Sequence, residues 1–245
     1  MNNILELKNV DYTYHTPQGE TNALSDISLC IEDGEFLSIV GPSGCGKSTL
    51  LSIISGLLTP SSGTIEFNGQ NIGYMLQKDH LFEWRTIYKN VTLGLEIQKK
   101  LDKPHIENVN NMLETYGLER FKNARPSELS GGMRQRAALI RTLALEPDLL
   151  LLDEPFSALD YQTRLQVCDD IYGIIKKEGK TAILITHDLS EAISIGGRVV
   201  VLTKRPGKIK KVIDINYPEE FSSPFLARNA PEFKNYFNLV WKEVK

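Results

Sequence analysis

The run Gly-Pro-Ser-Gly-Cys-Gly-Lys-Ser-Thr at residues 41–49 restricts the fold of this chain more than any other segment. It follows a short apolar run at 36–40. It leads into residues 48–56, whose apolar spacing is that of a helix ending at a glycine. A G-x-x-x-x-G-K-[ST] pattern between a buried strand and a helix is typical of a phosphate-binding loop, and this setting argues against a chance glycine-rich loop. The sequence therefore predicts an α/β core with this loop at the end of a strand.

The residue types of this loop suit ATP and Mg²⁺. Glycines let the backbone bend so that successive N–H groups point at phosphate oxygens, and the following helix adds its positive end. Lys47 is expected to reach the β- and γ-phosphates, and the Ser48 hydroxyl to ligate Mg²⁺. Cys45 needs only to be small. The predicted phosphate-binding residues are Gly41, Pro42, Ser43, Gly44, Cys45, Gly46, Lys47 and Ser48.

Two carboxylates follow a run of four leucines at residues 149–152. Such a run predicts a buried central strand, and open α/β sheets place their ligands where strands end. Asp153 is suited to holding Mg²⁺ directly or through water. Glu154 is suited to polarising the attacking water as general base. A buried strand ending in a purely structural Asp-Glu turn is the less favoured alternative.

Composition limits the function classes. The chain has 245 residues, of which 41% are hydrophobic, and a net charge of −3, which gives no electrostatic signature of nucleic-acid binding. No apolar run is long enough to span a membrane, and the first residues lack the features of a signal peptide, so membrane contact is expected only through a partner. The cysteines, Cys30, Cys45 and Cys168, are too widely spaced for a zinc or disulfide pattern, which favours a reducing, cytoplasmic compartment.

Hydrophobic periodicity predicts the remaining elements. Strands are expected within 4–14 and 23–31, a short strand pair at 63–69, and central parallel strands at 149–152, 182–185 and 199–202. The basic run at 204–211 is expected to follow a solvated strand and turn. Residues 86–145 are mostly helical in pattern, with an interruption near Pro126. The apolar spacing within residues 231–245 predicts an amphipathic helix. We expect its apolar face to pack on its own domain rather than on a partner. That face contains Phe233, Tyr236, Phe237, Val240, Trp241 and Val244.

The run Leu-Ser-Gly-Gly-Met at residues 129–133 resembles the signature of ATP-binding-cassette (ABC) ATPases, with Met133 in place of the commonest glutamine. Gln77, the run 157–160 ending in Asp160, and His187 resemble the Q-loop, D-loop and switch histidine of that family, in the usual order. The resemblance covers essentially the whole chain. It implies a single domain over residues 1–245: an α/β P-loop NTPase (RecA-like) core, an antiparallel β subdomain and an α-helical signature subdomain at about 86–145.

The resemblance also implies roles for residues. Gln77 would sense Mg²⁺ and the attacking water, His187 would contact the γ-phosphate, and Thr49 the α-phosphate. Ser130, Gly131 and Gly132, at a helix N-terminus, form a second anion site with no nucleotide in their own chain. In the family, this signature caps the ATP of a second, head-to-tail subunit, expected here to be an identical chain. The implied catalytic residues are Glu154, His187, Gln77 and Lys47, and the implied metal ligands Ser48, Gln77 and Asp153.

An aromatic residue is expected to stack on adenine. Tyr14 matches the family's A-loop aromatic, and its distance from Val10 and Gly34 favours it over Tyr12. Either tyrosine could instead be ordinary strand packing.

The segment 76–91, containing Leu-Phe-Glu-Trp-Arg-Thr at 81–86, resembles the nitrate/sulfonate/taurine importer subfamily. That resemblance implies a peripheral subunit at the cytoplasmic face of the membrane, acting on transmembrane permease subunits fed by an extracytoplasmic solute-binding protein. Trp84 is favoured as part of a groove, with Leu81 and Phe82, for a permease helix; a core aromatic is the alternative. The region between Gly69 and Gln77 is shorter than usual for the subfamily, and the resemblance implies that solute specificity lies in the binding protein and the permease.

Two other classes of ATP-using protein fit the sequence less well. A soluble ABC ATPase of DNA repair, chromosome structure or translation usually carries a long coiled coil, tandem cassettes or basic insertions. Here only about fifty residues separate Gln77 from Ser130, and there is one phosphate loop. An ATP-dependent kinase or transferase would leave Ser130, Asp160 and His187 without a role.

Overall fold

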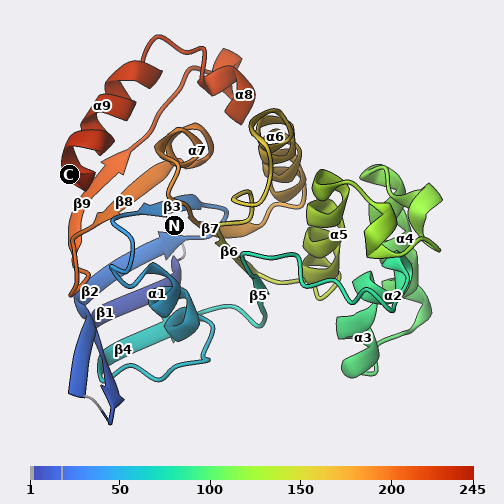
Figure 1. The fold of residues 1–245 in the computed structure, drawn as a ribbon, viewed down its shortest axis with the longest axis horizontal. Helices are drawn as coiled ribbons and strands as arrows, with labels where there is room; N and C mark the ends of the chain where they lie inside the picture. The colour runs from blue at the N-terminus through green and yellow to red at the C-terminus, as the bar shows by residue number, and fades with distance from the viewer. Residues whose placement is uncertain (1–2, 18) are drawn as a thin grey trace.

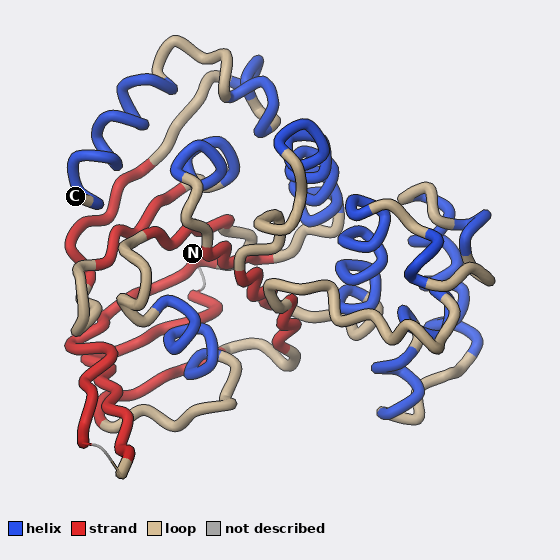
Figure 2. The backbone as a smooth tube through the Cα atoms, viewed as in Figure 1, coloured by secondary structure: helices blue, strands red, loops and turns tan. Residues whose placement is uncertain are grey.

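The computed structural model describes residues 3–17 and 19–245. It contains two β-sheets and a group of helices that projects to one side (Figure 1). The larger sheet carries the loop of residues 41–46, and the helical group lies beyond its edge strand β5 (Figures 1 and 2). None of the helices in the described part of the chain is long and apolar enough to cross a membrane.

The larger sheet has six strands in the order β5-β6-β7-β3-β8-β9. The first five run parallel to their neighbours, and β9 is antiparallel to β8. The strands predicted at 149–152, 182–185 and 199–202 are therefore confirmed. Their bounds are Phe36–Val40 (β3), Ile72–Met75 (β5), Leu149–Asp153 (β6), Thr181–Ile185 (β7), Arg198–Leu202 (β8) and Ile209–Asp214 (β9).

The leucine run of β6 packs on both faces of this sheet. Leu149 and Leu151 belong to the apolar cluster that also holds helix α1 (Lys47–Ile54) and the second sheet. Leu150 and Leu152 belong to the cluster with helices α5 (Gly131–Leu143) and α6 (Tyr161–Lys177). Because successive side chains of a strand point to opposite faces, an unbroken apolar run is what a strand covered on both sides requires.

The second sheet is antiparallel, in the order β2-β1-β4, with bounds Asn3–Thr16 (β1), Gly19–Glu32 (β2) and Ser62–Phe67 (β4). The strand pair predicted within 63–69 was wrong. These residues form one strand, and its partner is β1, with Ile65 opposite Leu7. Pairing with β1 adds β4 to an existing sheet. A strand pair made from seven residues alone would not be stable. The basic run at 204–211 also differs from the prediction, because its second half enters β9.

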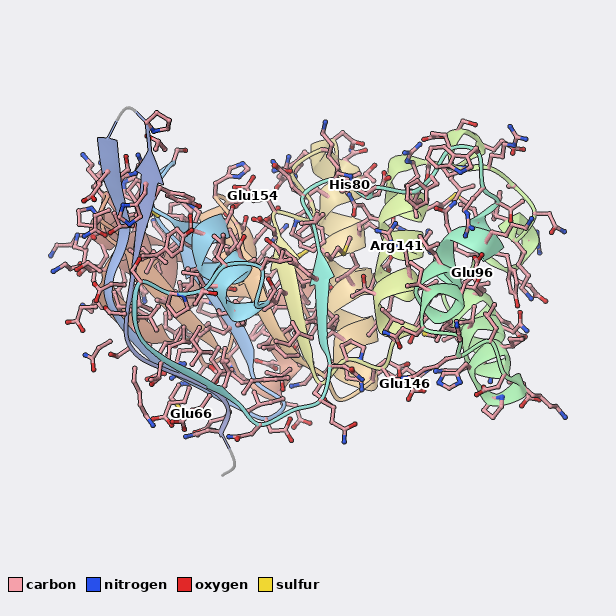
Figure 3. The ribbon with its side chains drawn as sticks, turned by 90° about the horizontal axis from the view of Figure 1, so that it is seen from below. Glu66, His80, Glu96, Arg141, Glu146 and Glu154 are labelled. Carbon is pink, nitrogen blue, oxygen red and sulfur yellow. The ribbon has the colours of Figure 1, made fainter. Side chains whose placement is uncertain are left out.

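The helical group comprises α2 (Ile87–Val91), α3 (Leu93–Ile97), α4 (Lys103–Thr115), two 3₁₀ turns at Glu119–Phe121 and Pro126–Glu128, and α5. The predicted interruption near Pro126 is the second of these turns. Figure 3 shows the group at one end of the molecule, with Glu96 on it, and the antiparallel sheet at the other end. Fully buried Ile87, Val91 and Leu113 join it to the cluster that also contains the strand residues Leu150 and Leu152.

The chain ends in α7 (Leu189–Ile195), a 3₁₀ turn at Glu219–Phe221, α8 (Pro224–Ala227) and α9 (Phe233–Val244). The apolar face of α9 packs on α7 and the strands β8 and β9, with Val240 fully buried. This agrees with packing on its own domain. Trp241 lies at the edge of that face: it is 48% exposed and stacks on Phe237, with ring centroids 6.2 Å apart.

Candidate nucleotide-binding site

The loop 41–46 joins β3 to α1, as the motif predicted. Gly46 has φ 104°, and a Cβ there would lie 2.7 Å from Leu24 Cδ2 and 2.9 Å from the Ala23 carbonyl oxygen. A side chain at Gly46 is therefore excluded by both conformation and space. Gly44, with φ 74°, also needs a left-handed conformation. These glycines turn the backbone around the N-terminus of α1, where N–H groups and the helix dipole favour an anion.

Lys47 is folded back over this loop. Its ammonium donates to the carbonyl oxygens of Gly41 at 2.8 Å and Pro42 at 3.1 Å, and the residue is only 8% exposed. Among the described residues, no carboxylate is hydrogen-bonded to this ammonium, so its donors are held by carbonyl oxygens that an anion can supplement. The side chain is placed to serve a phosphate at the mouth of the loop.

Ser48 and Asp153 approach each other from different elements. The Ser48 hydroxyl, on α1, donates to Asp153 Oδ1 at 3.4 Å, and the Tyr74 hydroxyl, on β5, donates to Oδ2 at 3.4 Å. Burial, and to a lesser extent the neighbouring Glu154, raises the pKa of Asp153. Burial and the Asp153 carboxylate raise the pKa of Tyr74 to about 12. A buried carboxylate without a cationic hydrogen-bond partner is a suitable ligand for a metal ion.

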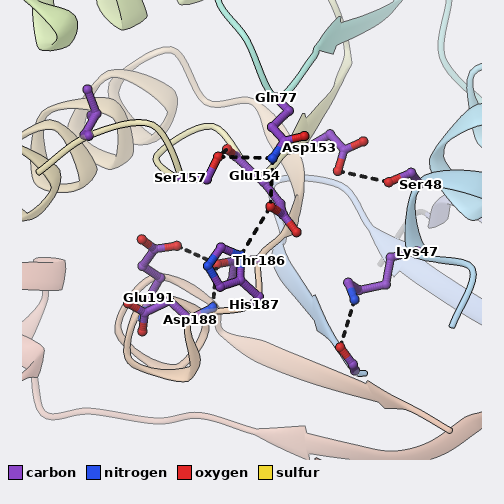
Figure 4. Close-up of polar contacts among 12 residues, drawn as sticks. Lys47, Ser48, Gln77, Asp153, Glu154, Ser157, Thr186, His187, Asp188 and Glu191 are labelled. Atoms are coloured by element: carbon purple, nitrogen blue, oxygen red, sulfur yellow. Dashed lines mark hydrogen bonds and ion pairs between the residues drawn. The ribbon is translucent and has the colours of Figure 1, made fainter. Parts of the chain in front are cut away.

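Glu154 occupies a left-handed backbone conformation, with φ 46°. Its N–H donates to the Ile185 carbonyl oxygen at 2.9 Å, so the turn is fixed to the end of β7. Its carboxylate meets two of the predicted partners (Figure 4): Gln77 Nε2 donates to Oε2 at 3.2 Å, and His187 Nδ1 lies 3.2 Å from the same oxygen. Non-glycine residues rarely adopt positive φ, and strain of this kind concentrates at functional sites.

The turn that carries His187 is supported from behind. The buried Thr186 hydroxyl donates to Glu191 Oε2 at 2.5 Å and accepts the Asp188 N–H at 3.0 Å. Asp188 caps α7 by accepting the N–H of Ser190 at 2.8 Å. Burial raises the pKa of Glu191, although Thr186 and Arg164 favour its charged form. These contacts fix the backbone on either side of His187.

A pocket of about 370 Å³ connects the loop with β1, which carries both Tyr12 and Tyr14, and with β2. Tyr14 lines it, is 39% exposed, and its hydroxyl lies 3.1 Å from Thr49 Oγ1. Tyr12 is instead packed against the core, with its ring edge-on to Tyr14 at 4.8 Å between centroids. The geometry therefore favours Tyr14 as the aromatic residue available to a base. The pocket is lined by Tyr14, Thr21, Ala23, Ser43, Gly44, Gly46, Lys47, Ser48, Thr49, Gln77, Glu154 and Arg205.

The signature residues form a separate site. Ser130 caps α5 by accepting the Met133 N–H at 3.4 Å, and at this helix N-terminus Gly131 is exposed whereas Gly132 is buried. A Cβ at Gly131 would lie 2.9 Å from Leu159 Cδ2, and one at Gly132 2.7 Å from Val167 Cγ2. The three residues line a second pocket with Asp160, and it shares no lining residue with the first. In Figure 1, α1 and α5 lie on opposite sides of β5.

The loop after Gln77 is clamped onto α5, a feature that the sequence analysis missed. Arg134 donates to both carboxylate oxygens of Asp79, at 2.8 and 3.2 Å, and Arg141 donates to the His80 carbonyl oxygen at 2.7 Å. Figure 3 shows Arg141 and His80 close together at the boundary with the helical group. The residues joined by these hydrogen bonds lie 55 to 62 positions apart in the chain, so their contact could not be predicted from local sequence. The only sequence signal was seven-residue spacing of the arginines along one helix face.

Trp84 is 71% exposed, so the core-aromatic alternative is wrong. Phe82 packs against it, with ring centroids 4.7 Å apart. Leu81 does not belong to this surface as predicted, because it is buried in the core with α5 and α6. The fully buried Asn90 holds the backbone of the turn, accepting the Phe82 N–H at 2.7 Å and donating to the Phe82 carbonyl oxygen at 3.1 Å.

The sequence analysis did not assign Thr21, Ala23 or Arg205 to the nucleotide pocket. Thr21 and Ala23 reach it because β2 is paired with the strand of Tyr14, and Thr21 is directly opposite Tyr14. Alternation from Tyr14 across a predicted hairpin could have suggested Thr21. Arg205 arrives from the turn after β8, about 160 residues from the loop, and no local pattern marks it.

Comparison with known proteins assigns a family to this architecture. The ABC transporter family profile matches residues 24–157. The chain is 45% identical to an uncharacterized ABC transporter ATP-binding protein, YtlC, of Bacillus subtilis, with 98% of this chain and 95% of the relative covered. It is 42% identical to a taurine import ATP-binding protein of Jannaschia (88% and 84% covered) and 40% identical to a nitrate import ATP-binding protein of Synechocystis (96% and 93% covered).

Solved structures show the same fold. A dimeric bacterial ABC transporter cassette, MJ0796, superposes with a TM-score of 0.74 at 32% identity, covering 87% of this chain and all of that one. A dimer of MJ0796 in a post-hydrolysis state, bound to ADP and phosphate, gives a TM-score of 0.73 at 31% identity over the same shares of the two chains.

Replacing Tyr14 tests its place in the pocket. Tyr14→Ala should weaken ATP binding by about tenfold, because stacking of a base on an aromatic ring contributes about 1–3 kcal/mol, whereas Tyr14→Phe should bind nearly as well as the unaltered chain. Titration with a fluorescent ATP analogue measures both. Tyr12→Phe is the matched control and should leave affinity unchanged. Equal losses in Tyr12→Phe and Tyr14→Ala would contradict the assignment.

Proposed function

The chain belongs to the ABC transporter family and is an ATPase, and we propose that it is the ATP-hydrolysing subunit of an importer that takes up a small solute through a separate permease. The observation that carries this proposal is the presence of two separate anion sites on one chain. One surrounds Lys47 with the catalytic carboxylate beside it, and the other is the pocket at the N-terminus of α5 that Ser130 lines. A kinase or a solitary NTPase needs only the first.

The geometry around Glu154 supports its role as general base. Its carboxylate faces the nucleotide pocket, with Gln77 and His187 both at 3.2 Å from Oε2. Hydrogen bonds from these two side chains orient the carboxylate toward a water placed in line with the γ-phosphate. Proton transfer to a carboxylate so placed contributes to catalysis, while Lys47 and the loop N–H groups stabilise the charge that develops on the phosphate.

The residues present fit Mg²⁺. The Ser48 hydroxyl and Asp153 Oδ1 are 3.4 Å apart, which suits two neighbouring ligands of an ion with oxygen ligands at about 2.1 Å. Gln77 is the third proposed ligand. Within residues 3–17 and 19–245, no group of three or more His, Cys, Asp or Glu side chains could hold a metal. This agrees with an ion bound mainly through phosphates and water. When bound, Mg²⁺ would neutralise phosphate charge.

A second copy of the chain completes each site in this proposal. Ser130, Gly131 and Gly132 would cap the ATP held by the Lys47 loop of the partner, and the D-loop residue Asp160 lines the same pocket as Ser130. The solved MJ0796 cassettes are described as dimers, which supports a homodimer here. Closure would exclude water from the γ-phosphate, and loss of that phosphate would let the two subunits separate.

The solute class is inferred from the relatives. Proteins 39–42% identical to this chain are named as import ATP-binding proteins for taurine, nitrate and aliphatic sulfonates. We therefore propose a nitrate-, sulfonate- or taurine-type solute or a related small organic molecule, delivered by a solute-binding protein. The chain would sit peripherally at the cytoplasmic face of the membrane. A soluble ABC ATPase of DNA repair or translation is not favoured, because the segment between Gln77 and Ser130 is a compact set of short helices without a coiled-coil insertion.

The exposed pair Phe82 and Trp84 is the proposed contact with the permease. Exposed large aromatics of this kind are typical centres of interfaces. The turn that carries them is fixed by Asn90, and the preceding Asp79 and His80 are fixed by Arg134 and Arg141 of α5. Motion of a bound permease helix would therefore reach α5, whose N-terminus is the signature, and Gln77 at the catalytic carboxylate.

Glu154→Gln should keep ATP affinity while slowing hydrolysis by a factor of about 10² or more, because only the proton acceptor is lost. The uncleaved nucleotide should also hold a dimer together, seen by size exclusion in ATP and Mg²⁺. Lys47→Ala is the contrasting variant and should lose ATP binding itself. Normal turnover by Glu154→Gln would exclude Glu154 as the base.

Mixing two inactive variants tests the shared sites. Ser130→Arg places bulk and charge at the partner's phosphate and should abolish hydrolysis, yet each subunit should still bind ATP. Lys47→Ala should be inactive for the opposite reason. In a mixed dimer one site carries both defects and the other carries neither, so combining them should restore partial ATPase activity. No recovery in dimers shown to be mixed would contradict composite sites.

Trp84→Ala should weaken assembly with the cognate permease by about 2 kcal/mol or more, measured by co-purification, and remove transport-stimulated hydrolysis. ATPase activity of the isolated subunit should survive, because Trp84 touches no catalytic residue. The other tryptophan of the chain supplies the control: Trp241→Ala, on the C-terminal helix, should assemble normally. Equal losses in both variants would place the permease contact elsewhere.

A further inference from the structure

The turn between β8 and β9 is built against the phosphate-binding loop. Gly207 donates its N–H to the Ala23 carbonyl oxygen at 2.9 Å and accepts the Ser25 N–H at 2.9 Å, so the turn is tied to β2. A Cβ at Gly207 would lie 2.1 Å from the Cys45 carbonyl oxygen. The turn is also closed within itself, because Thr203 Oγ1 donates to the Pro206 carbonyl oxygen and accepts the Lys208 N–H, both at 3.0 Å.

This turn brings Arg205 into the wall of the nucleotide pocket. Its Nε donates to the Gly44 carbonyl oxygen at 3.0 Å. Its Nη2 also packs against Gly44, because a Cβ added to that glycine would lie only 3.1 Å from this nitrogen. Lys47 and Arg205 are the two cationic side chains that line the pocket. Lys47 is buried and turned toward Gly41 and Pro42, whereas Arg205 is exposed on the Gly44 side of the loop.

We propose that Arg205 is a further nucleotide-binding residue, which is anchored on Gly44 and presents its outer guanidinium nitrogens to the polyphosphate of ATP. Guanidinium carries five N–H donors in a planar fork that matches phosphate oxygens. One donor is used on Gly44, and within the described ranges, 3–17 and 19–245, Nη1 and Nη2 make no other hydrogen bond. The inference rests on ATP occupying this pocket, as proposed above.

The setting of Arg205 differs from that of three arginines elsewhere in the chain that are held by ion pairs. Arg85, Arg134 and Arg198 each bind a carboxylate, from Glu96, Asp79 and Glu35 respectively. Arg205 forms no ion pair within the part of the chain that the structure describes. Its positive charge is held in place by a backbone carbonyl of the phosphate loop itself. An anion brought to that loop is therefore its natural counter-charge.

The test compares Arg205→Gln, Arg205→Lys and the neighbouring Lys204→Gln. Lys204 is exposed and does not line the pocket, so its variant removes the same net charge without touching the site. ATP affinity is measured by displacement of a fluorescent ATP analogue in Mg²⁺, at ionic strengths from about 50 mM to about 500 mM, because salt screens an exposed charge contact. Thermal unfolding of each variant establishes that it folds.

Arg205→Gln should bind ATP about fivefold more weakly at low salt, and its difference from the unaltered chain should shrink as salt is raised. Arg205→Lys, which keeps the charge, should stay within about twofold, and Lys204→Gln should be unchanged. Unaltered affinity in Arg205→Gln overturns the proposal. So does an equal, salt-independent loss in both Arg205 variants, which would make Arg205 only a brace for Gly44. Normal ATP binding by Lys47→Ala would instead contradict the proposed function, because ATP would then not occupy this pocket.

Discussion

The hydrogen-bonded register of the parallel strands β6, β7 and β3 is the constraint on which the site depends. Asp153 lies opposite Ile185 on β7, and Ile185 in turn lies opposite Ile39 on β3. The phosphate loop, the two carboxylates and the His187 turn therefore all begin at one edge of the sheet. The side chains of Asp153, Glu154 and His187 need not reach far, since each lies at or just after the end of a buried strand.

The site contains a strained backbone conformation and buried charged groups, and the surrounding structure offsets their cost. Glu154 has positive φ, and Asp153 and Lys47 are charged groups removed from most solvent. The Glu154 N–H bond to Ile185 and the carbonyl bonds of Lys47 offset part of this cost. Residues 149–152 and 182–185, fully or nearly fully buried on both faces of the sheet, supply the apolar burial that keeps the strand ends in place.

The two proposed anion sites lie in different parts of the molecule. The catalytic edge belongs to the core, whereas the signature belongs to α5 of the helical group. The loop from Asp79 to Trp84 connects them, because it follows Gln77 and is fixed to α5 by Arg134 and Arg141. In the proposed function, a displacement of the exposed Phe82 and Trp84 would therefore act on both sites.

Sequence by itself determined the strand–loop–helix around Lys47, the buried strand before Asp153 and Glu154, and the order of the remaining motifs. Each rests on contiguous residues whose pattern is set by burial on both faces of a sheet or by the conformational needs of glycine. Tertiary structure alone decided the partner of β4, the burial of Leu81 beside the exposed Trp84, and the arrival of Arg205 at the phosphate loop. These depend on which distant segments pair and pack. Hydrogen bonds and contacts between residues far apart in the chain leave no periodicity in either segment, so only the folded chain reveals them.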